Sequence, residues 1–327
     1  MASAKSPPVK EPLAPTYSPP KTGIVLYFPP AWVPYGELMR LDKPAGIYLF
    51  YLPHLVGTLY AACIINPKPP LPSLVKTNLI FFVGTVFMRG SACSWNDNLD
   101  QDYDRQVFRC KTRPIARGAI TTARGHAFTA FLTAIASTFL VLLPSRCMYY
   151  AVPSIFLLWL YPFGKRFTDY PQIILGLQMS IGIFMGMVAM GVDPTVESEK
   201  IQGSICALYT SFVAWTVVYD TVYARQDIKD DAKAGVKSMS VKFQHWTKAL
   251  LWVCATTQAG LLVLAGVLAD MGAIYFTVAC GGTALSLVVM IQKVKLEEPA
   301  NCMWWFKNAF WHVGIPVCSG LVGEYYT

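Results

Sequence analysis

The chain has 327 residues, of which 54% are hydrophobic and only 14% carry a charge, with a formal net charge of +8. Soluble globular domains contain about 25% charged residues, so this composition excludes a soluble enzyme. We therefore predict a polytopic membrane protein.

Residues 1–38 are rich in Pro, Lys and Ser and show little apolar periodicity. A segment of this kind cannot bury enough apolar surface to fold, so we predict a disordered tail. It lacks the apolar core and cleavage site of a secretory signal. It also lacks the Arg-rich amphipathic helix of a mitochondrial presequence, since the first arginine is Arg40. Residues 39–327 are predicted to form one transmembrane domain.

Nine apolar stretches follow, most of them near the ~20 residues that are needed to cross a bilayer. They cover approximately residues 45–65, 75–95, 125–144, 148–163, 172–192, 203–221, 247–268, 271–292 and 308–325. We predict a transmembrane helix for each of them.

The lysines and arginines predict the orientation of these helices. With nine spans, the N-terminal tail shares one side with the loops after the second, fourth, sixth and eighth helices. That side holds 22 Lys and Arg residues, against 4 on the opposite side. Because cytoplasmic loops carry the excess, we predict that this side faces the cytosol.

The nine cysteines and four histidines form no metal-ligand pattern, and most cysteines fall within apolar runs. We expect free, buried thiols, and packing or interface roles for the histidines.

A first polar segment, NDNLDQDYDRQVFRCKTRPIARG, directly follows the second apolar stretch. On a helix, Asn96, Asp100 and Asp104 recur every four residues with Asp97 beside them, so the four share one face. Like charges at this spacing repel each other unless a cation is bound. Mg²⁺ prefers such oxygen ligands together with substrate phosphates. A solvated, salt-bridged helix end is the alternative for this stretch by itself.

A second polar segment, YDTVYARQDIKDDAKAGVKS, follows the sixth apolar stretch on the same predicted side. Asp220, Asp227 and Asp231 are seven and four residues apart, so they line one helical stripe. Two acidic stripes facing one compartment, in a chain this poor in charge, favour a functional site over two solvated helix ends.

Basic residues near both segments suit a phosphorylated ligand. Arg89 lies seven residues before Asn96 on the same helical face, where an arginine in an apolar helix needs an anionic partner. Lys165 and Arg166 belong to a short loop on the same side and could bind the ligand. Snorkelling of these side chains to the lipid headgroups explains them equally well. Arg40 lies just before the first helix, where it could instead serve only to anchor the helix on the cytosolic side.

A diphosphate ester with an apolar tail accounts for metal sites, a basic rim and an apolar cavity together. Metal and basic side chains would neutralise the diphosphate and stabilise charge as the carbon–oxygen bond breaks. An allylic tail would leave as a carbocation, which must be kept from water and is stabilised by aromatic faces. Candidate aromatic residues are Tyr219, Tyr223, Trp95, Phe87 and Phe163.

The two acidic segments resemble a known pair of motifs. NDNLDQDYD is similar to the NDxxDxxxD motif of the UbiA-type membrane aromatic prenyltransferases, and YDTVYARQDIKDD to their YDTxYAxxDxxDD motif. RLDKPAG, MRGSA and YPFGKRFTDYPQ extend the similarity, which runs from Arg40 to Ser238. The resemblance implies an all-α bundle of nine transmembrane helices around a central cavity, and Mg²⁺-dependent transfer of a prenyl group from its diphosphate to an aromatic ring.

The resemblance also implies roles for individual residues. The residues expected to bind Mg²⁺ and the diphosphate are Asn96, Asp97, Asp100, Asp104, Asp220, Asp227 and Asp231, with Asp100, Asp104, Asp227 and Asp231 as catalytic residues. The candidate diphosphate contacts are Arg89, Arg105, Arg113, Lys165, Arg166 and Lys237, and the candidate acceptor contacts are Arg40, Trp95, Tyr219 and Tyr223. Trp95 stands where the family has an aliphatic residue, which leaves the acceptor open.

Within the family, the chain most resembles the 4-hydroxybenzoate type, which includes the mitochondrial ubiquinone enzyme and fungal enzymes of meroterpenoid biosynthesis. Because residues 1–38 lack a presequence, we expect the second kind, in the endoplasmic reticulum or a related endomembrane, with the active site facing the cytosol. It would transfer farnesyl to a polyketide-derived phenolic acid or pyrone. The expected partners are a prenyl diphosphate, an aromatic acceptor and the lipid bilayer, and no nucleic acid.

Two alternatives remain. The first is 4-hydroxybenzoate polyprenyltransferase of ubiquinone biosynthesis, in the mitochondrial inner membrane. The second, from another class, is a membrane transporter of an anionic solute, which predicts polar groups deep in several helices and an internal repeat. The carboxylates of this chain instead cluster on one side, and no repeat is visible.

Overall fold

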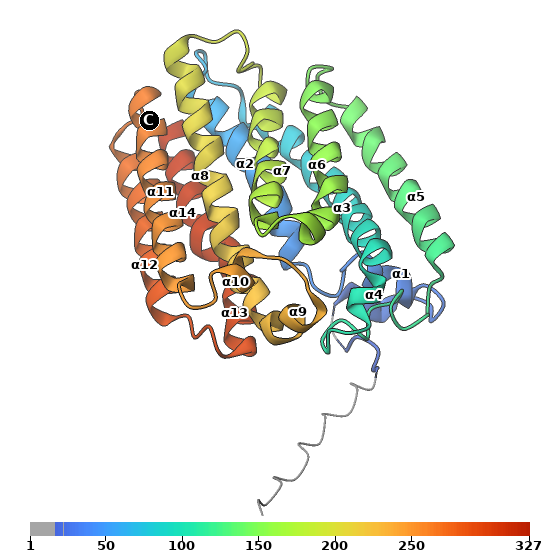
Figure 1. The fold of residues 1–327 in the computed structure, drawn as a ribbon. Coiled ribbons are helices and arrows are strands. Elements are labelled where there is room, and N and C mark those ends of the chain that lie inside the picture. The colour runs from blue at the N-terminus through green and yellow to red at the C-terminus, as the bar shows by residue number, and fades with distance from the viewer. Residues whose placement is uncertain (1–16, 22) are drawn as a thin grey trace, which may run out of the picture.

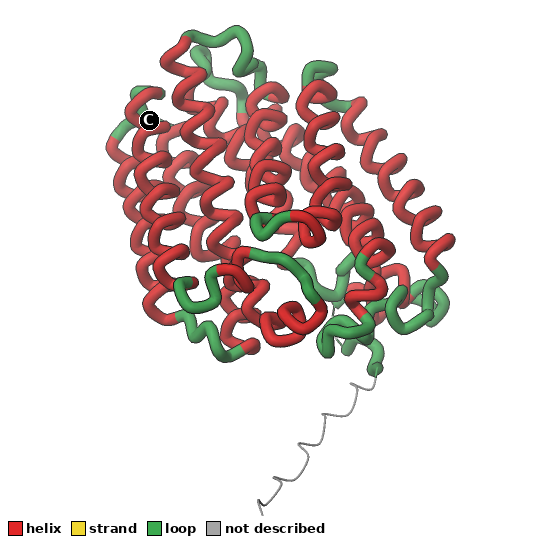
Figure 2. Tube along the Cα trace, in the orientation of Figure 1, coloured by secondary structure: helices red, strands yellow, loops and turns green. Residues whose placement is uncertain are grey.

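The structure, a computed structural model, describes residues 17–21 and 23–327. Among these residues there are helices and connecting loops but no strand (Figure 2). The prediction of an all-α protein is therefore confirmed.

Long helices run side by side through the bundle (Figure 1). They are α2 (Ala45–Ile64), α3 (Leu71–Leu99), α5 (Thr122–Val141), α6 (Cys147–Phe167), α7 (Pro171–Ala189), α8 (Glu199–Ala224) and α11 (Thr247–Leu268). α12 (Gly282–Lys293) continues the π-helical turn Tyr275–Gly281, and α13 (Pro299–Ala309) continues through Phe310–Gly314 into α14 (Ile315–Tyr325). In Figure 1, α8, α11, α12 and α14 stand on one side, α3, α5 and α6 on the other, and α2 and α7 between them.

Every predicted apolar stretch falls on one of these helices, and seven of the helices described are long and apolar enough to span a membrane. The seven are α2, α3, α6, α7, α11, the helix that begins at Glu199 and the helix Tyr275–Lys293. α5 and α14, which carry the third and ninth stretches, are not among them. The expected total of nine membrane crossings therefore stays a prediction.

The short helices gather at one end of the bundle. They are α1 (Val33–Leu38), α4 (Gln101–Asp104), the 3₁₀ turn η2 (Arg225–Asp227), α9 (Ile228–Ala234) and α10 (Met239–Lys242). Figure 1 places α1, α4, α9, α10 and α13 at its lower end. Both acidic segments of the sequence end there.

Part of the predicted disordered tail is folded. Residues 24–27 form a 3₁₀ helix and α1 follows, with Val25 and Leu38 buried. Leu38 packs against Ile115 and Ile120 of the loop after α4. The prolines that suggest disorder include one in the first turn of α1, where a missing N–H costs nothing. Residues 1–16 and 22 lie outside the described residues, so the prediction is not tested there.

The cysteines are free in the part of the chain that the structure describes, as expected. They are not all buried, because Cys206 is exposed on the outer surface of α8.

α2 and α7 cross so closely that their contact depends on glycine. A Cβ atom on Gly57 would lie 2.2 Å from the carbonyl oxygen of Ile183, and one on Gly186 would lie 2.4 Å from the carbonyl oxygen of His54. Both obstacles are backbone atoms of the facing helix, which cannot rotate away. This contact holds together the two helices that separate the two sides of the bundle.

We expect Gly186→Ala to destabilise the protein by about 1–3 kcal/mol, because the added methyl group forces α2 and α7 apart. Thermal unfolding of the purified protein in detergent measures the effect. Gly260→Ala on α11 is the matched control, since nothing lies within 4 Å of a Cβ at that position. Equal unfolding temperatures for the two variants would contradict the proposed helix contact.

Candidate active site

The two acidic segments meet in space, as the sequence predicts. Arg109, in the loop after α4, donates from Nε to Asp227 Oδ1 at 3.0 Å and from Nη2 to Asp227 Oδ2 at 2.5 Å. These residues are 118 positions apart in the chain. The backbone N–H of Phe108 donates to Asp230 Oδ2 at 3.0 Å, which adds a second link between the same segments.

Asp97 and Asp104 share one arginine. Arg113 Nη1 lies 2.8 Å and 2.9 Å from the two carboxylate oxygens of Asp104, and 3.2 Å from Asp97 Oδ1. Arg40 Nη2 lies 2.8 Å from both oxygens of Asp97. Burial raises the pKa of Asp104, and Arg113 opposes this rise. The two arginines therefore pair with two buried carboxylates that lie side by side.

Three oxygen atoms of the first motif are buried without a hydrogen-bond partner among the described residues, namely Oδ1 of Asn96, of Asn98 and of Asp100. The other oxygen of Asp100 accepts a hydrogen bond from Lys165 Nζ at 2.7 Å. An unpartnered buried oxygen costs about 1–3 kcal/mol, and amide and carboxylate oxygens are the ligands that Mg²⁺ prefers. The donor set therefore fits a magnesium ion.

Basic side chains occupy four carboxylates of the two motifs, Asp97, Asp100, Asp104 and Asp227, in this arrangement. Within residues 17–21 and 23–327, no three His, Cys, Asp or Glu side chains are grouped closely enough to bind one metal ion. To bind a metal, the carboxylates would have to turn away from Arg40, Arg109, Arg113 and Lys165.

A chamber opens beside these ion pairs, between α2, α3, α6, α7 and α8. It contains about 910 Å³ of empty space, open solvent included. Its polar lining consists of Arg40, Arg89, Cys93, Asn96, Asp97, Arg113, Lys165 and Gln178, and its aromatic lining of Phe50, Tyr161, Tyr219, Tyr223 and Phe306. One end of the chamber therefore suits an anion and the rest suits a hydrocarbon.

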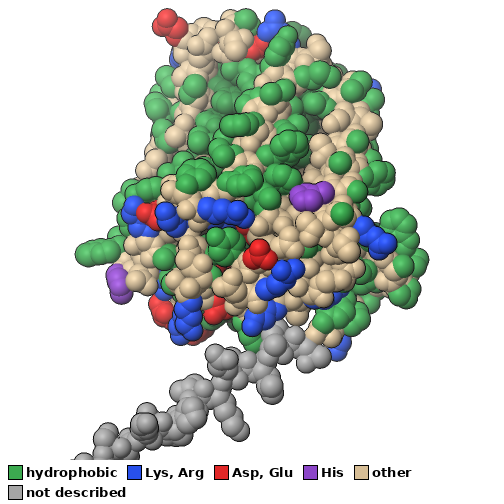
Figure 3. All heavy atoms as spheres, turned by 45° about the vertical axis from the view of Figure 1, so that its right-hand side comes forward, with side chains coloured by type: hydrophobic (Ala, Val, Ile, Leu, Met, Phe, Trp, Pro, Cys, Tyr) green, Lys and Arg blue, Asp and Glu red, His purple; other side chains and the backbone are tan. Residues whose placement is uncertain are grey.

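The chamber continues into a wider mouth with about 1970 Å³ of empty space, open solvent included. The mouth shares Arg40, Arg89 and Arg113 with the chamber, and adds the basic residues Lys43, Arg109 and Lys307. Figure 3 shows Lys, Arg, Asp and Glu concentrated around this end of the molecule, below a belt that is mainly hydrophobic.

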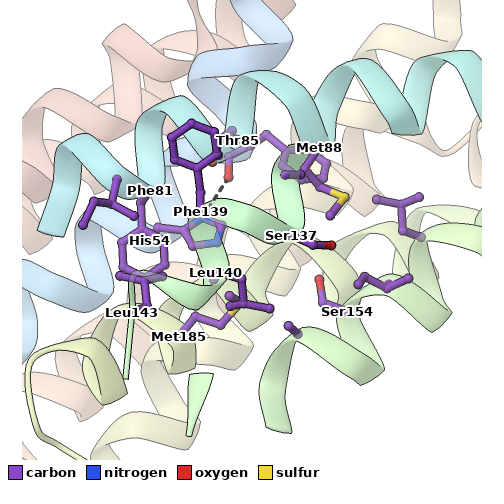
Figure 4. A pocket seen from close by; sticks show the side chains of 18 of the residues that line it. His54, Phe81, Thr85, Met88, Ser137, Phe139, Leu140, Leu143, Ser154 and Met185 are labelled. Carbon is purple, nitrogen blue, oxygen red and sulfur yellow. Dashed lines mark hydrogen bonds between the residues drawn. The ribbon is translucent and has the colours of Figure 1, made fainter. Parts of the chain in front are cut away.

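An apolar pocket adjoins the chamber on its other side and shares Phe50, Leu158, Gln178 and Met179 with it. It contains about 720 Å³ of empty space and lies between α2, α3, α5, α6 and α7. Figure 4 shows His54, Phe81, Phe139, Leu140, Leu143 and Met185 around it. Mouth, chamber and pocket thus change from strongly basic to apolar along one path.

Three predicted acceptor contacts, Arg40, Tyr219 and Tyr223, line the chamber, whereas Trp95 does not. The Trp95 ring lies between α3, α5 and α6, near Trp159 and His126, and its Nε1 donates to the carbonyl oxygen of Trp159 at 3.2 Å. Successive residues of a helix point about 100° apart, so the neighbour of Asn96 faces a different direction. The geometry therefore does not support an acceptor contact by Trp95.

Only some of the predicted diphosphate contacts line the chamber. Arg89, Arg113 and Lys165 line the chamber. Arg105 instead donates to Asp102 at the surface, and Arg166 to the carbonyl oxygen of Leu99. The backbone N–H of Lys237 donates to the carbonyl oxygen of Lys165, but its side chain is not part of the lining.

The aspartates of the second acidic motif lie around the chamber rather than in its lining. Asp227 reaches the mouth through Arg109. Asp220 is buried directly after Tyr219, a residue of the chamber wall, and Asp231 is half-buried on α9.

Sequence reasoning missed several residues of the site. Arg109 could have been identified from the sequence, because it lies among the basic residues that follow the first motif. The sequence gives no indication for Phe306 and Lys307, because they belong to α13, which precedes the last apolar stretch and has no recognisable motif. The C-terminal helices therefore contribute to the site as well.

The sequence matches the model of the UbiA prenyltransferase family over residues 51–314. The chain belongs to this family. Prenyltransferase ascA of Acremonium egyptiacum is 41% identical over 87% of the chain and 83% of its own length. DMOA farnesyltransferase nvfB of Aspergillus novofumigatus is 35% identical over 91% of the chain and 93% of its own length. The mitochondrial 4-hydroxybenzoate polyprenyltransferase of Saccharomyces cerevisiae is 36% identical over 91% of the chain and 77% of its own length.

The fold agrees with this assignment. A UbiA homologue from Archaeoglobus fulgidus, solved with GPP and Mg²⁺, superposes with a TM-score of 0.67 over 90% of this chain and 100% of its own, at 17% identity. The protein is thus a prenyltransferase of the UbiA family with its fold embedded in a membrane.

We expect Arg113→Ala to destabilise this UbiA-family protein by about 3 kcal/mol, because, among the described residues, it leaves the buried carboxylate of Asp104 without a basic partner and Asp97 with Arg40 alone. Thermal unfolding without substrate or metal measures the loss. Arg105→Ala, in the same loop, is the control, because its partner Asp102 is 84% exposed and such pairs contribute little. An Arg113→Ala protein as stable as the Arg105→Ala protein would refute the role given to this arginine.

Proposed function

We propose that this protein transfers a prenyl group from its diphosphate to an aromatic acceptor in a Mg²⁺-dependent reaction. The observation that carries the proposal is the joining of the two acidic motifs, through Arg109 and Asp227, at the basic mouth of a chamber that leads to an apolar pocket. A molecule that fits this path is anionic at one end and a hydrocarbon at the other.

The donor would bind with its diphosphate at the mouth and its tail towards the apolar pocket. Arg40, Arg109, Arg113 and Lys165 now neutralise carboxylates and lie where the phosphates would arrive. Each would exchange a carboxylate for a phosphate oxygen, so no charge would be left unpaired. Tail burial adds about 0.8 kcal/mol for each methylene group.

Asn96, Asp97, Asp100 and Asp104 would hold Mg²⁺ from one side, and Asp220, Asp227 and Asp231 from the other. When bound, Mg²⁺ neutralises the diphosphate and makes it a better leaving group. The unpartnered oxygens of Asn96 and Asp100 support this assignment, as does the Mg²⁺ named with the Archaeoglobus homologue.

The chamber walls would protect the reacting carbon. The carbon–oxygen bond breaks, its electron pair leaves with the diphosphate, and an allylic cation remains. The rings of Tyr161, Tyr219, Tyr223 and Phe306 surround the chamber and can stabilise this cation while water is excluded. The acceptor ring attacks the cation, a carbon–carbon bond forms, and loss of the ring proton restores aromaticity.

Arg89 would bind an anionic group of either substrate. It lines both the chamber and the mouth, and among the described residues its side chain has no carboxylate partner. Its guanidinium packs over Gly46, where a Cβ atom would lie 2.8 Å from Arg89 Nη2. A positive group kept free in this position favours a diphosphate or an acidic acceptor.

We infer that the donor is farnesyl diphosphate and the acceptor a polyketide-derived phenolic acid or pyrone, in meroterpenoid biosynthesis. Similarity to the farnesyltransferase of Aspergillus novofumigatus over nearly the whole chain supports this choice. Similarity to the yeast 4-hydroxybenzoate polyprenyltransferase is of the same order and favours the ubiquinone pathway as the second candidate. The excess of basic residues around the mouth supports a site that faces the cytosol, in an endomembrane.

A substrate panel tests the donor and acceptor. Purified protein in detergent with Mg²⁺ is incubated with geranyl, farnesyl and geranylgeranyl diphosphate, each with phenolic acids and pyrones, and products are read by mass spectrometry. We expect the farnesyl adduct of a polyketide-type phenol to dominate. Preference for 4-hydroxybenzoate with longer donors would favour the second candidate, and no adduct with any pair would refute the proposal.

We expect Asp100→Ala and Asp227→Ala each to lower the turnover number by about 100-fold or more, because each removes a proposed ligand of the Mg²⁺ that would stabilise the departing diphosphate. Asp102→Ala is the matched control, since this carboxylate is 84% exposed and, within the described part of the chain, pairs only with Arg105 at the surface. Excess chelator should stop the wild-type reaction. Undiminished turnover in either motif variant would overturn the roles assigned to the acidic residues.

A further inference from the structure

One buried arginine of the second acidic motif lies outside the chamber and its mouth, where α8 ends and η2 begins. Arg225 begins η2, two residues after Tyr223 and two before Asp227. Its side chain is only 4% exposed. Desolvating a guanidinium costs several kcal/mol unless each of its donors is satisfied, so its partners matter.

Three nitrogen atoms of Arg225 donate to three different residues. Nε reaches the carbonyl oxygen of Leu296 at 3.4 Å, and Nη1 that of Gln244 at 3.3 Å. Nη2 reaches Glu297 Oε1 at 2.7 Å. These partners belong to the segment before α11 and to the segment between α12 and α13. One side chain thus ties the end of α8 to two segments of the C-terminal part of the chain.

The segments that Arg225 joins both lead to residues of the site. On one side, the chain turns directly from Arg225 into Asp227, whose only ion-pair partner in the described structure, Arg109, is itself partly exposed. On the other side, Leu296 and Glu297 immediately precede α13, which carries Phe306. The Phe306 ring packs against that of Tyr223, with centroids 4.3 Å apart, and both line the chamber.

We propose that Arg225 is a positioning residue that holds Asp227 and the Phe306–Tyr223 wall in register for binding of the magnesium diphosphate. It touches no substrate, and this inference rests on the proposed function. The planar guanidinium is required because its donors point in fixed, divergent directions, whereas a lysine ammonium is a single point charge and cannot reach all three acceptors.

The test measures binding rather than turnover. Purified wild-type protein in detergent is titrated with Mg²⁺ at a fixed concentration of inorganic diphosphate, and the Mg²⁺ concentration that gives half of the thermal stabilisation is recorded. For Arg225→Lys we expect this concentration to rise about 10-fold, as for other partners that orient metal ligands. Glu297→Lys changes an exposed residue into one that repels Arg225, so it should also raise the half-saturating Mg²⁺ concentration. This variant provides the test if Arg225→Lys does not fold.

Glu298→Lys is the matched control, because it makes the same charge change one residue away, where the carboxylate contacts Lys295 instead. A purely structural role would lower the unfolding temperature of the variants and leave the half-saturating Mg²⁺ concentration unchanged, and that result would overturn the inference. An Arg225→Lys protein with wild-type Mg²⁺ dependence would do the same. Absence of Mg²⁺-diphosphate stabilisation in the wild type would instead overturn the proposed function.

Discussion

The arrangement of this protein depends on charge compensation at the end of an apolar helix bundle. Asp97 is 1% exposed, Asp100 is 3% exposed and Asp104 is 5% exposed, and carboxylates at such depth are tolerated only when they are paired. Arg40, Arg113 and Lys165 supply the pairing from three different parts of the chain. The loop after α4, the segment before α2 and the end of α6 are thereby drawn together around one cluster.

The same compensation makes the site suited to a phosphorylated substrate. Pairs of carboxylate and base can separate when a magnesium diphosphate arrives, because it offers the carboxylates a cation and the bases an anion. The buried, unpartnered oxygens of Asn96 and Asp100 show that the protein's own bases do not satisfy the cluster completely. These oxygens lower the stability of the protein without a ligand, and a bound cation would satisfy them. Active sites commonly give up stability in this way for function.

The apolar part of the site follows from helix packing. Glycines at the crossing of α2 and α7 bring these helices into backbone contact, while α5 and α6 stand on the far side of the apolar pocket. Aromatic residues from α6, α8 and α13 then complete the chamber. A polar mouth, an aromatic chamber and an apolar pocket are thus parts of one path, consistent with the family to which the chain belongs.

The sequence by itself determined the helical membrane class, the two acidic motifs and the family, because composition, apolar run length and residue spacing are local properties. Only the tertiary structure decided which bases pair with which carboxylates, that Trp95 faces away from the chamber, and that Phe306 and Lys307 belong to the site. It also showed that residues 24–38 are folded, through the contact of Leu38 with Ile115 and Ile120. These facts depend on contacts between residues far apart in the chain, which no local pattern records.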